Sequence, residues 1–180
     1  MDTTKAYNTY ESYPLISYNC IKYLMDNNEL VWKLLKYTDN RPYEKSNLTK
    51  SEKGALIYGG QPNSALFNVF MDFGADDSIT NEVSILRISP LELVPNNYVW
   101  GSITLGCEVY VHYKINTMSN YQTRCDTIIH ELIKTFNGAE ISGVGKLFFD
   151  ASANSRTRVA LIGAIPMKGK LLTMGNISLG

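Results

Sequence analysis

Apolar residues recur at helical spacing through the first part of the chain. Between residues 17 and 37 two apolar faces follow one another, and the polar residues 26–28 separate them. Those polar residues offer an N-cap, so we predict two short helices, or one helix with a kink. Thr49 and Glu52 stand at capping-box spacing and predict a third short helix before Gly59 and Gly60. The first 60 residues are therefore expected to be α-rich.

From Ala65 onwards the pattern changes to the alternation of strands. We predict five strands, at residues 66–73, 82–89, 104–115, 146–150 and 158–165. Residues 91–97 have the composition of a loop, and residues 166–180 show no obvious role in the core.

The segment 104–115 shows the clearest alternation. One face is apolar, and the other carries Glu108, Tyr110, His112 and Lys114. This pattern predicts one face in the core and one face in water or against a partner.

The segment 119–138 has the strongest helical pattern. Its apolar stripe ends just before Gly138, which suits the C′ position, and consists of Cys125, Ile128, Ile129, Leu132, Ile133 and Phe136. The whole order predicts an α+β fold, in which a long helix packs on one antiparallel or mixed sheet. We expect an N-terminal arm with helices over residues 1–60 and a core domain with a C-terminal tail over residues 61–180.

The charge balance argues against a dedicated nucleic-acid binder. Lysine plus arginine and aspartate plus glutamate both number 17, so the formal net charge is zero. No apolar run approaches the ~20 residues of a membrane span, and the first twenty residues lack the apolar core of a signal peptide. We therefore expect a soluble protein made in the cytoplasm, with no membrane partner.

A GxGK sequence at Gly143–Lys146 resembles a phosphate-binding loop at first sight. A P-loop needs a glycine at position 140, where this chain has Glu140, and a hydroxyl at position 147, where it has Leu147. The pattern also runs from helix to turn to strand, the reverse of the required order. We interpret Gly138, Gly143 and Gly145 as turn positions with positive φ.

Other apparent active sites are equally incomplete. His130-Glu131 lacks the second histidine of a zinc protease, because Lys134 stands in its place. Asp76 and Asp77 fit an ordinary turn, and Cys125 lies on an apolar stripe where a thiol stays protonated. The three cysteines show no zinc spacing, so we expect free, buried thiols. The sequence therefore predicts no catalytic residues, no metal and no cofactor.

From about residue 65 to residue 175, a strand leads to a helix that begins R-x-D-x-I, and a glycine-containing hairpin then leads to a final strand. The residues at these positions are Arg124, Asp126, Ile128, Gly138, Gly143, Gly145 and the segment Pro166 to Gly169. This order and these residues resemble the tail-terminator and neck proteins of tailed bacteriophages, in which the helix begins R-x-D-x-I/L.

The resemblance implies a structural virion protein without enzymatic activity or cofactor, assembled in the host cytoplasm. Such subunits form a ring, commonly a hexamer, which contacts neighbouring neck and tail-tube proteins while DNA passes through the lumen without specific binding. Candidate interface residues are Glu108, Tyr110, His112, Lys114, Arg156 and Arg158. The alternatives are a head-completion stopper or adaptor of the same neck, and a small cytoplasmic enzyme of unrecognised type.

Overall fold

The structure is a computed structural model that describes residues 13–60, 67–72, 82–95, 101–148, 156–162 and 165–176. For the last two ranges it describes the backbone only. Asp76, Asp77, most of the predicted N-terminal arm and residues 149–155 lie outside these residues.

The three α-helices of the N-terminal segment lie where the sequence predicts them. They are α2 (Ile16–Asn27), α3 (Glu29–Lys36) and α4 (Lys50–Ala55). The short 3₁₀ helices η2 (Tyr13–Leu15) and η3 (Pro42–Glu44) were not predicted. Asn28 is the predicted N-cap, and its side-chain oxygen accepts a hydrogen bond from the amide of Val31. The capping box of Thr49 and Glu52 is also confirmed at the start of α4.

The described residues of the second half form a mixed sheet and the long helix α5. The elements are β1 (Val69–Phe70), β2 (Ser84–Pro95), β3 (Gly101–His112), η5 (Tyr113–Ile115), α5 (Arg124–Phe136), β4 (Glu140–Ile141), β5 (Gly145–Phe148), β6 (Arg156–Ile162) and β7 (Ile165–Asn176). The strand order is β1-β2-β3-β7-β5-β4, with β6 also pairing with β7. Among the strands that the structure describes, only β1 runs parallel to its neighbour. The predicted α+β class with a mixed sheet and N-terminal helices is confirmed.

Two predictions about strands are wrong. Residues 91–95 are not a loop, because β2 continues through a β-bulge between Pro90 and Glu92 and stays paired with β3. The C-terminal tail is not peripheral, because β7 pairs with β3 on one side and with β5 and β6 on the other. Neither result could be seen from local composition, since prolines and glycines within these strands imitate loop sequence.

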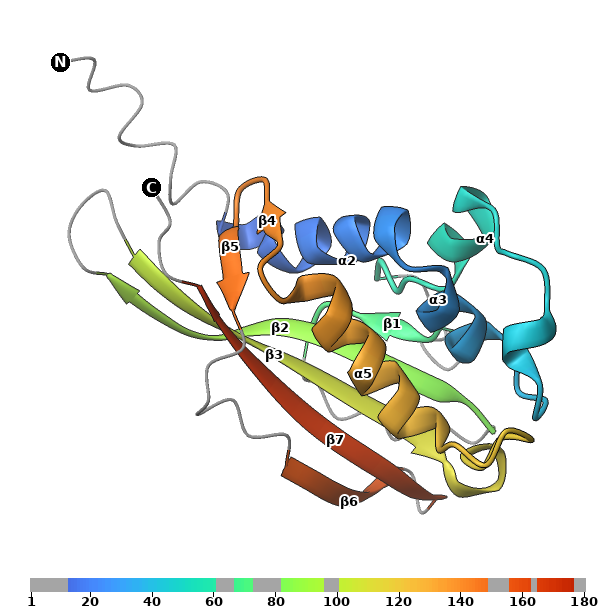
Figure 1. The fold of residues 1–180 in the computed structure, drawn as a ribbon. Coiled ribbons are helices and arrows are strands. Elements are labelled where there is room, and N and C mark those ends of the chain that lie inside the picture. Colours follow the sequence, from blue (N-terminus) through green and yellow to red (C-terminus); the bar gives the residue numbers. More distant parts are fainter. Residues whose placement is uncertain are drawn as a thin grey trace, which may run out of the picture.

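The helices α2, α3 and α5 lie together on one face of the sheet (Figure 1). Their apolar residues share one core with the inward residues of β2 and β3, which include Leu86, Ile88, Leu105 and Val109. Asn68 joins the layers, because its side-chain amide donates to the carbonyls of Leu35 in α3 and Ser84 in β2. The N-terminal helices and the sheet thus pack into a single core.

Candidate functional site

The polar residues predicted on one face of β3 are buried in the folded chain. Glu108, Tyr110 and His112 are 9 %, 8 % and 6 % exposed. Of the two predicted alternatives, water or a partner, exposure to water is wrong for these three residues, and their interface role stays a prediction. They offer little surface to another subunit as the chain is folded.

A second, smaller cluster accounts for the burial of Tyr110 on this face. Tyr110 packs with Phe70 and Ile85 on the side of the sheet away from the main core. The guanidinium of Arg87, itself 3 % exposed, lies 4.9 Å from the centre of the Phe70 ring. Strand β3 is therefore covered on both faces, although its sequence alternates like a half-exposed strand.

The remaining interface candidates lie elsewhere. Lys114 follows β3 in η5, is 56 % exposed, and its ammonium lies 2.8 Å from the carboxylate of Glu82. Arg156 and Arg158 lie in β6, and their side chains are outside the described residues. The interface role of these three residues stays a prediction.

The GxGK sequence forms a hairpin turn. Gly143 and Gly145 have φ values of 74° and 87°, and Gly138 has 77°. The turn joins the short strands β4 and β5, and Lys146 pairs back in register with Glu140. The interpretation of these glycines as positive-φ positions is confirmed.

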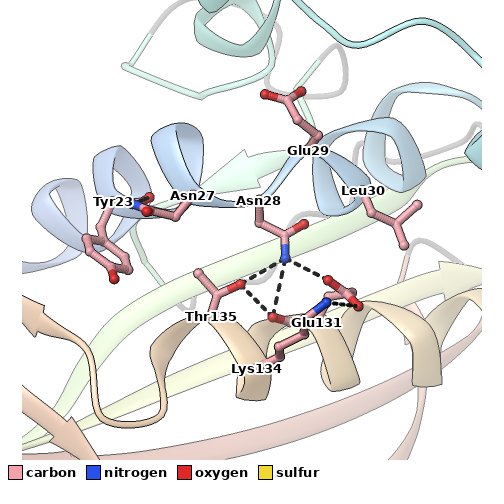
Figure 2. A pocket seen from close by; sticks show the side chains of 8 residues that line it. All are labelled: Tyr23, Asn27, Asn28, Glu29, Leu30, Glu131, Lys134 and Thr135. Carbon is pink, nitrogen blue, oxygen red and sulfur yellow. Dashed lines mark hydrogen bonds and ion pairs between the residues drawn. The ribbon is translucent and has the colours of Figure 1, made fainter.

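A polar groove of about 500 Å³ lies between the α2–α3 junction and the last turns of α5 (Figure 2). Asn28 stands at its centre. Its side-chain amide donates to the Glu131 carboxylate at 2.9 Å and to the Thr135 hydroxyl at 2.8 Å. Lys134 forms an ion pair with the same carboxylate at 3.6 Å. These bonds join the α2–α3 junction to α5. The side-chain amide of Asn28 therefore has a structural role.

A smaller hollow of about 280 Å³ opens over the first turns of α5. Its lining residues are Gln122, Thr123, Asp126, Thr127 and His130. His130 faces this hollow, whereas its neighbour Glu131 lines the groove at Asn28. The two side chains of the HE sequence therefore point to different places and cannot share an ion. In the described part of the chain, no three His, Cys, Asp or Glu side chains gather as a metal site.

The cysteines are free and buried, as the sequence predicts. Burial raises the pKa of the Cys20 thiol to about 12 and that of the Cys107 thiol well above its usual value. A protonated thiol is a poor nucleophile, so these two residues are inert at neutral pH.

Arg124 is a key residue whose structural role the sequence did not reveal. Its side chain is fully buried and donates to four backbone carbonyls, those of Leu34, Tyr37, Asp39 and Ile115. Burial lowers the pKa of Arg124 to about 10, which leaves the guanidinium charged at neutral pH. The sequence did contain one sign of this burial: Arg124 stands four residues before Ile128, which places it on the apolar stripe of the helix.

The sequence was compared with models of protein families, with curated proteins and with solved structures. The model of the YomW family matches residues 27–160, which is well over half of the chain. The chain belongs to the YomW family. No curated protein and no solved structure matches it.

The YomW family is phage-derived and of the Bacillus prophage type, so the protein is phage-associated. The expectation of a phage protein is confirmed at this level. The narrower assignment to a neck or tail terminator stays a prediction. None of the helices within the described ranges has the length and apolarity of a membrane span.

Proposed function

We propose that this YomW-family protein is a structural virion protein that forms a homo-oligomeric ring at the phage head–tail junction. It acts there as a tail terminator or tail-completion subunit, without enzymatic activity or cofactor. It is assembled in the host cytoplasm and contacts neighbouring neck and tail-tube proteins, while DNA passes through the ring.

The distribution of exposed apolar side chains carries this proposal. Six large apolar residues of the described chain are strongly exposed: Leu15, Tyr18, Leu91, Val94, Tyr113 and Tyr121. The first four belong to η2, the start of α2 and the distal part of β2, which lie at one end of the sheet (Figure 1). The last two follow the other end of β3.

Two different patches at opposite ends suit a ring. A head-to-tail contact joins two distinct surfaces of each subunit, and it closes when the rotation between copies fits a circle. Exposed large apolar side chains in such groups are typical of protein interfaces. The described polar side chains that could carry chemistry, such as Asn28 and Arg124, are instead bonded to the framework of the fold.

Light scattering at several protein concentrations, followed by negative-stain imaging of the largest species, tests the proposal. Rings with a hole wide enough for duplex DNA are the expected result. A subunit that stays monomeric is then mixed with purified tails that lack it, and separately with DNA-filled heads. Joining to tails supports the terminator role, joining to heads supports the stopper alternative, and joining to neither contradicts the proposal.

A further inference from the structure

The sequence contains a single Asn-Gly dipeptide, Asn137-Gly138, directly after helix α5. Asparagine followed by glycine is chemically labile, because the backbone nitrogen of the next residue can attack the side-chain carbonyl carbon. Glycine favours this attack, since it has no side chain to hinder ring closure and gives the backbone its widest range of conformations. The dipeptide is therefore a candidate modification site, and the fold decides whether it reacts.

The reaction consumes only water. The Gly138 amide loses its proton to water or hydroxide, and its nitrogen forms a bond to Cγ of Asn137. The bond from Cγ to Nδ2 breaks, and ammonia leaves with a proton taken from water, which produces a succinimide ring. Water then opens this ring at either carbonyl carbon, so that residue 137 becomes aspartate or isoaspartate. No atom is oxidised or reduced.

In the folded chain the attacking nitrogen is held in a hydrogen bond. The amide of Gly138 donates to the carbonyl of Leu147 in β5 at 2.8 Å, and the amide of Leu147 donates to the carbonyl of Ala139 at 2.9 Å. The N–H that must lose its proton is thus bonded to the β4–β5 hairpin that follows α5 (Figure 1). Loss of that proton requires this hydrogen bond to open first.

The backbone at Asn137 is also unsuited to ring closure. Its φ and ψ are −66° and 116°, an extended conformation at the C-cap of α5. The ring closes only when the Cα–Cβ bond eclipses the C–N bond to the next residue, and this ψ turns the two bonds far apart. The amide of Asn137 donates to the carbonyl of Ile133 at 2.9 Å, which fixes the residue to the last turn of the helix.

The neighbouring side chains make local opening costly. Phe136 and Leu147 are 0 % exposed and Ala139 is 8 % exposed, and all three belong to the main core. The hairpin cannot move away from α5 without withdrawing these side chains from the core. Asn137 and Gly138 are themselves exposed, and a Cβ at Gly138 would meet nothing within 4 Å. Water therefore reaches the dipeptide, and the backbone geometry is what protects it.

We infer that Asn137 is a self-modification site that the native fold keeps unreactive and that global unfolding exposes to reaction. The change is irreversible, and isoaspartate carries the main chain through an additional methylene. With that longer link, the hydrogen bonds from Ala139 to Phe136 and from Gly138 to Leu147 no longer fit the same geometry. This inference does not depend on the proposed ring, and its test measures no assembly.

Ageing of the full-length chain in native buffer and in guanidinium chloride, at the same mildly alkaline pH and temperature, tests the inference. Trypsin releases the dipeptide within residues 135–146, and mass spectrometry distinguishes the amide from the acid. Conversion is expected to be at least about a hundredfold slower in the folded pool, because few chains are unfolded there. Asn120 is exposed but precedes Tyr121, so this control site is expected to convert slowly in both pools.

The rates in the two pools decide the inference. Equal rates, or no conversion in the unfolded pool, overturn it. A series at denaturant concentrations below the unfolding midpoint separates global from local opening. The rate at Asn137 is expected to rise in proportion to the unfolded fraction measured by circular dichroism. A rate that rises ahead of that fraction shows local opening of the hairpin and overturns the role of the core.

Asn137→Gln is the matched variant. Its amide stands one methylene further from the backbone, so the ring it would close is larger and forms less readily. The variant is expected to lose conversion at residue 137 in guanidinium chloride, a measurement on the unfolded chain that does not depend on how well the variant folds. Conversion at the wild-type rate would refute the assignment.

Refolding of the aged wild-type chain gives a second measurement. The folded fraction, separated by size-exclusion chromatography, is expected to be depleted in isoaspartate at residue 137. Equal isoaspartate content in the folded and misfolded fractions would show that the modification leaves folding unaffected, and it would overturn the structural consequence inferred here.

Discussion

The guanidinium of Arg124 lies 2.9 Å from the carbonyl oxygen of Leu34, a residue 90 positions earlier in the chain. This bond joins the first turn of α5 to the last turn of α3. Carbonyls at the C-terminus of a helix lack partners within the helix and carry partial negative charge. A buried cation is therefore well placed there, and it holds the N-terminal helices against the second half of the chain.

Replacing Arg124 by methionine is expected to lower the free energy of unfolding by about 3–5 kcal/mol. The change leaves four carbonyls without the side chain that bonds them. Urea unfolding followed by circular dichroism measures the loss. Lysine at this position is expected to recover only part of it, because an ammonium cannot reach four acceptors in the same geometry.

The matched control is Arg41→Met. Arg41 is 62 % exposed and pairs with the exposed Glu44, so the change is expected to stay within about 0.5 kcal/mol. Equal unfolding midpoints for Arg124→Met and the wild type would contradict the structural role.

Asn28→Ala is expected to lower the free energy of unfolding by about 2–3 kcal/mol. The variant loses the N-cap of α3 and both bonds across the groove to α5. Asn28→Asp keeps the cap oxygen but places a second carboxylate beside Glu131, so its loss is expected to shrink as the pH falls. Asn27→Ala is the control, because Asn27 is exposed and its side-chain amide donates to the carbonyl of Tyr23 in the same helix. A loss for Asn27→Ala as large as that for Asn28→Ala would argue against the cross-brace.

Stability is expected to fall as the pH rises above about 9. The pKa of the Cys20 thiol is 9.0 in its ordinary state and about 12 in the fold. Between these values the unfolded chain loses a proton that the folded chain keeps, and this favours unfolding. Burial raises the pKa of Cys107 in the same direction. Denaturant titrations from pH 8 to 11 should show a steeper decline for the wild type than for a Cys20→Ala/Cys107→Ala variant. Parallel declines would contradict the assignment.

Replacing Gly138 or Gly54 by alanine is expected to change the free energy of unfolding in opposite directions. A Cβ at Gly138 or Gly54 meets nothing within 4 Å, so packing does not distinguish them. Gly138 has a φ of 77°, and alanine there is expected to destabilise by about 1 kcal/mol. Gly54 lies within helix α4, where alanine is expected to stabilise by about 0.5–1 kcal/mol. Thermal melts of the two variants give the signs directly.

Features that depend on neighbouring residues could be predicted from the sequence alone. The cap at Asn28, the capping box at Thr49 and the turn at Gly143 each need only a few adjacent residues. The apolar stripe of α5 and the inert thiols followed from spacing and residue type. These properties were predictable because their physical causes act within one or two turns of chain.

Other features were decided by contacts between distant segments. Glu108 and His112 are buried in the folded chain although they alternate with apolar residues along β3, and β7 is internal because three strands pair with it. Arg124 reaches carbonyls about 90 residues earlier. The sequence alone thus determined the α+β class, the helix caps and the glycine turns, since these follow from local backbone energies. Only the tertiary structure decided which polar residues are inside and which apolar residues stand exposed at the two ends, because burial depends on what the rest of the chain places over each side chain.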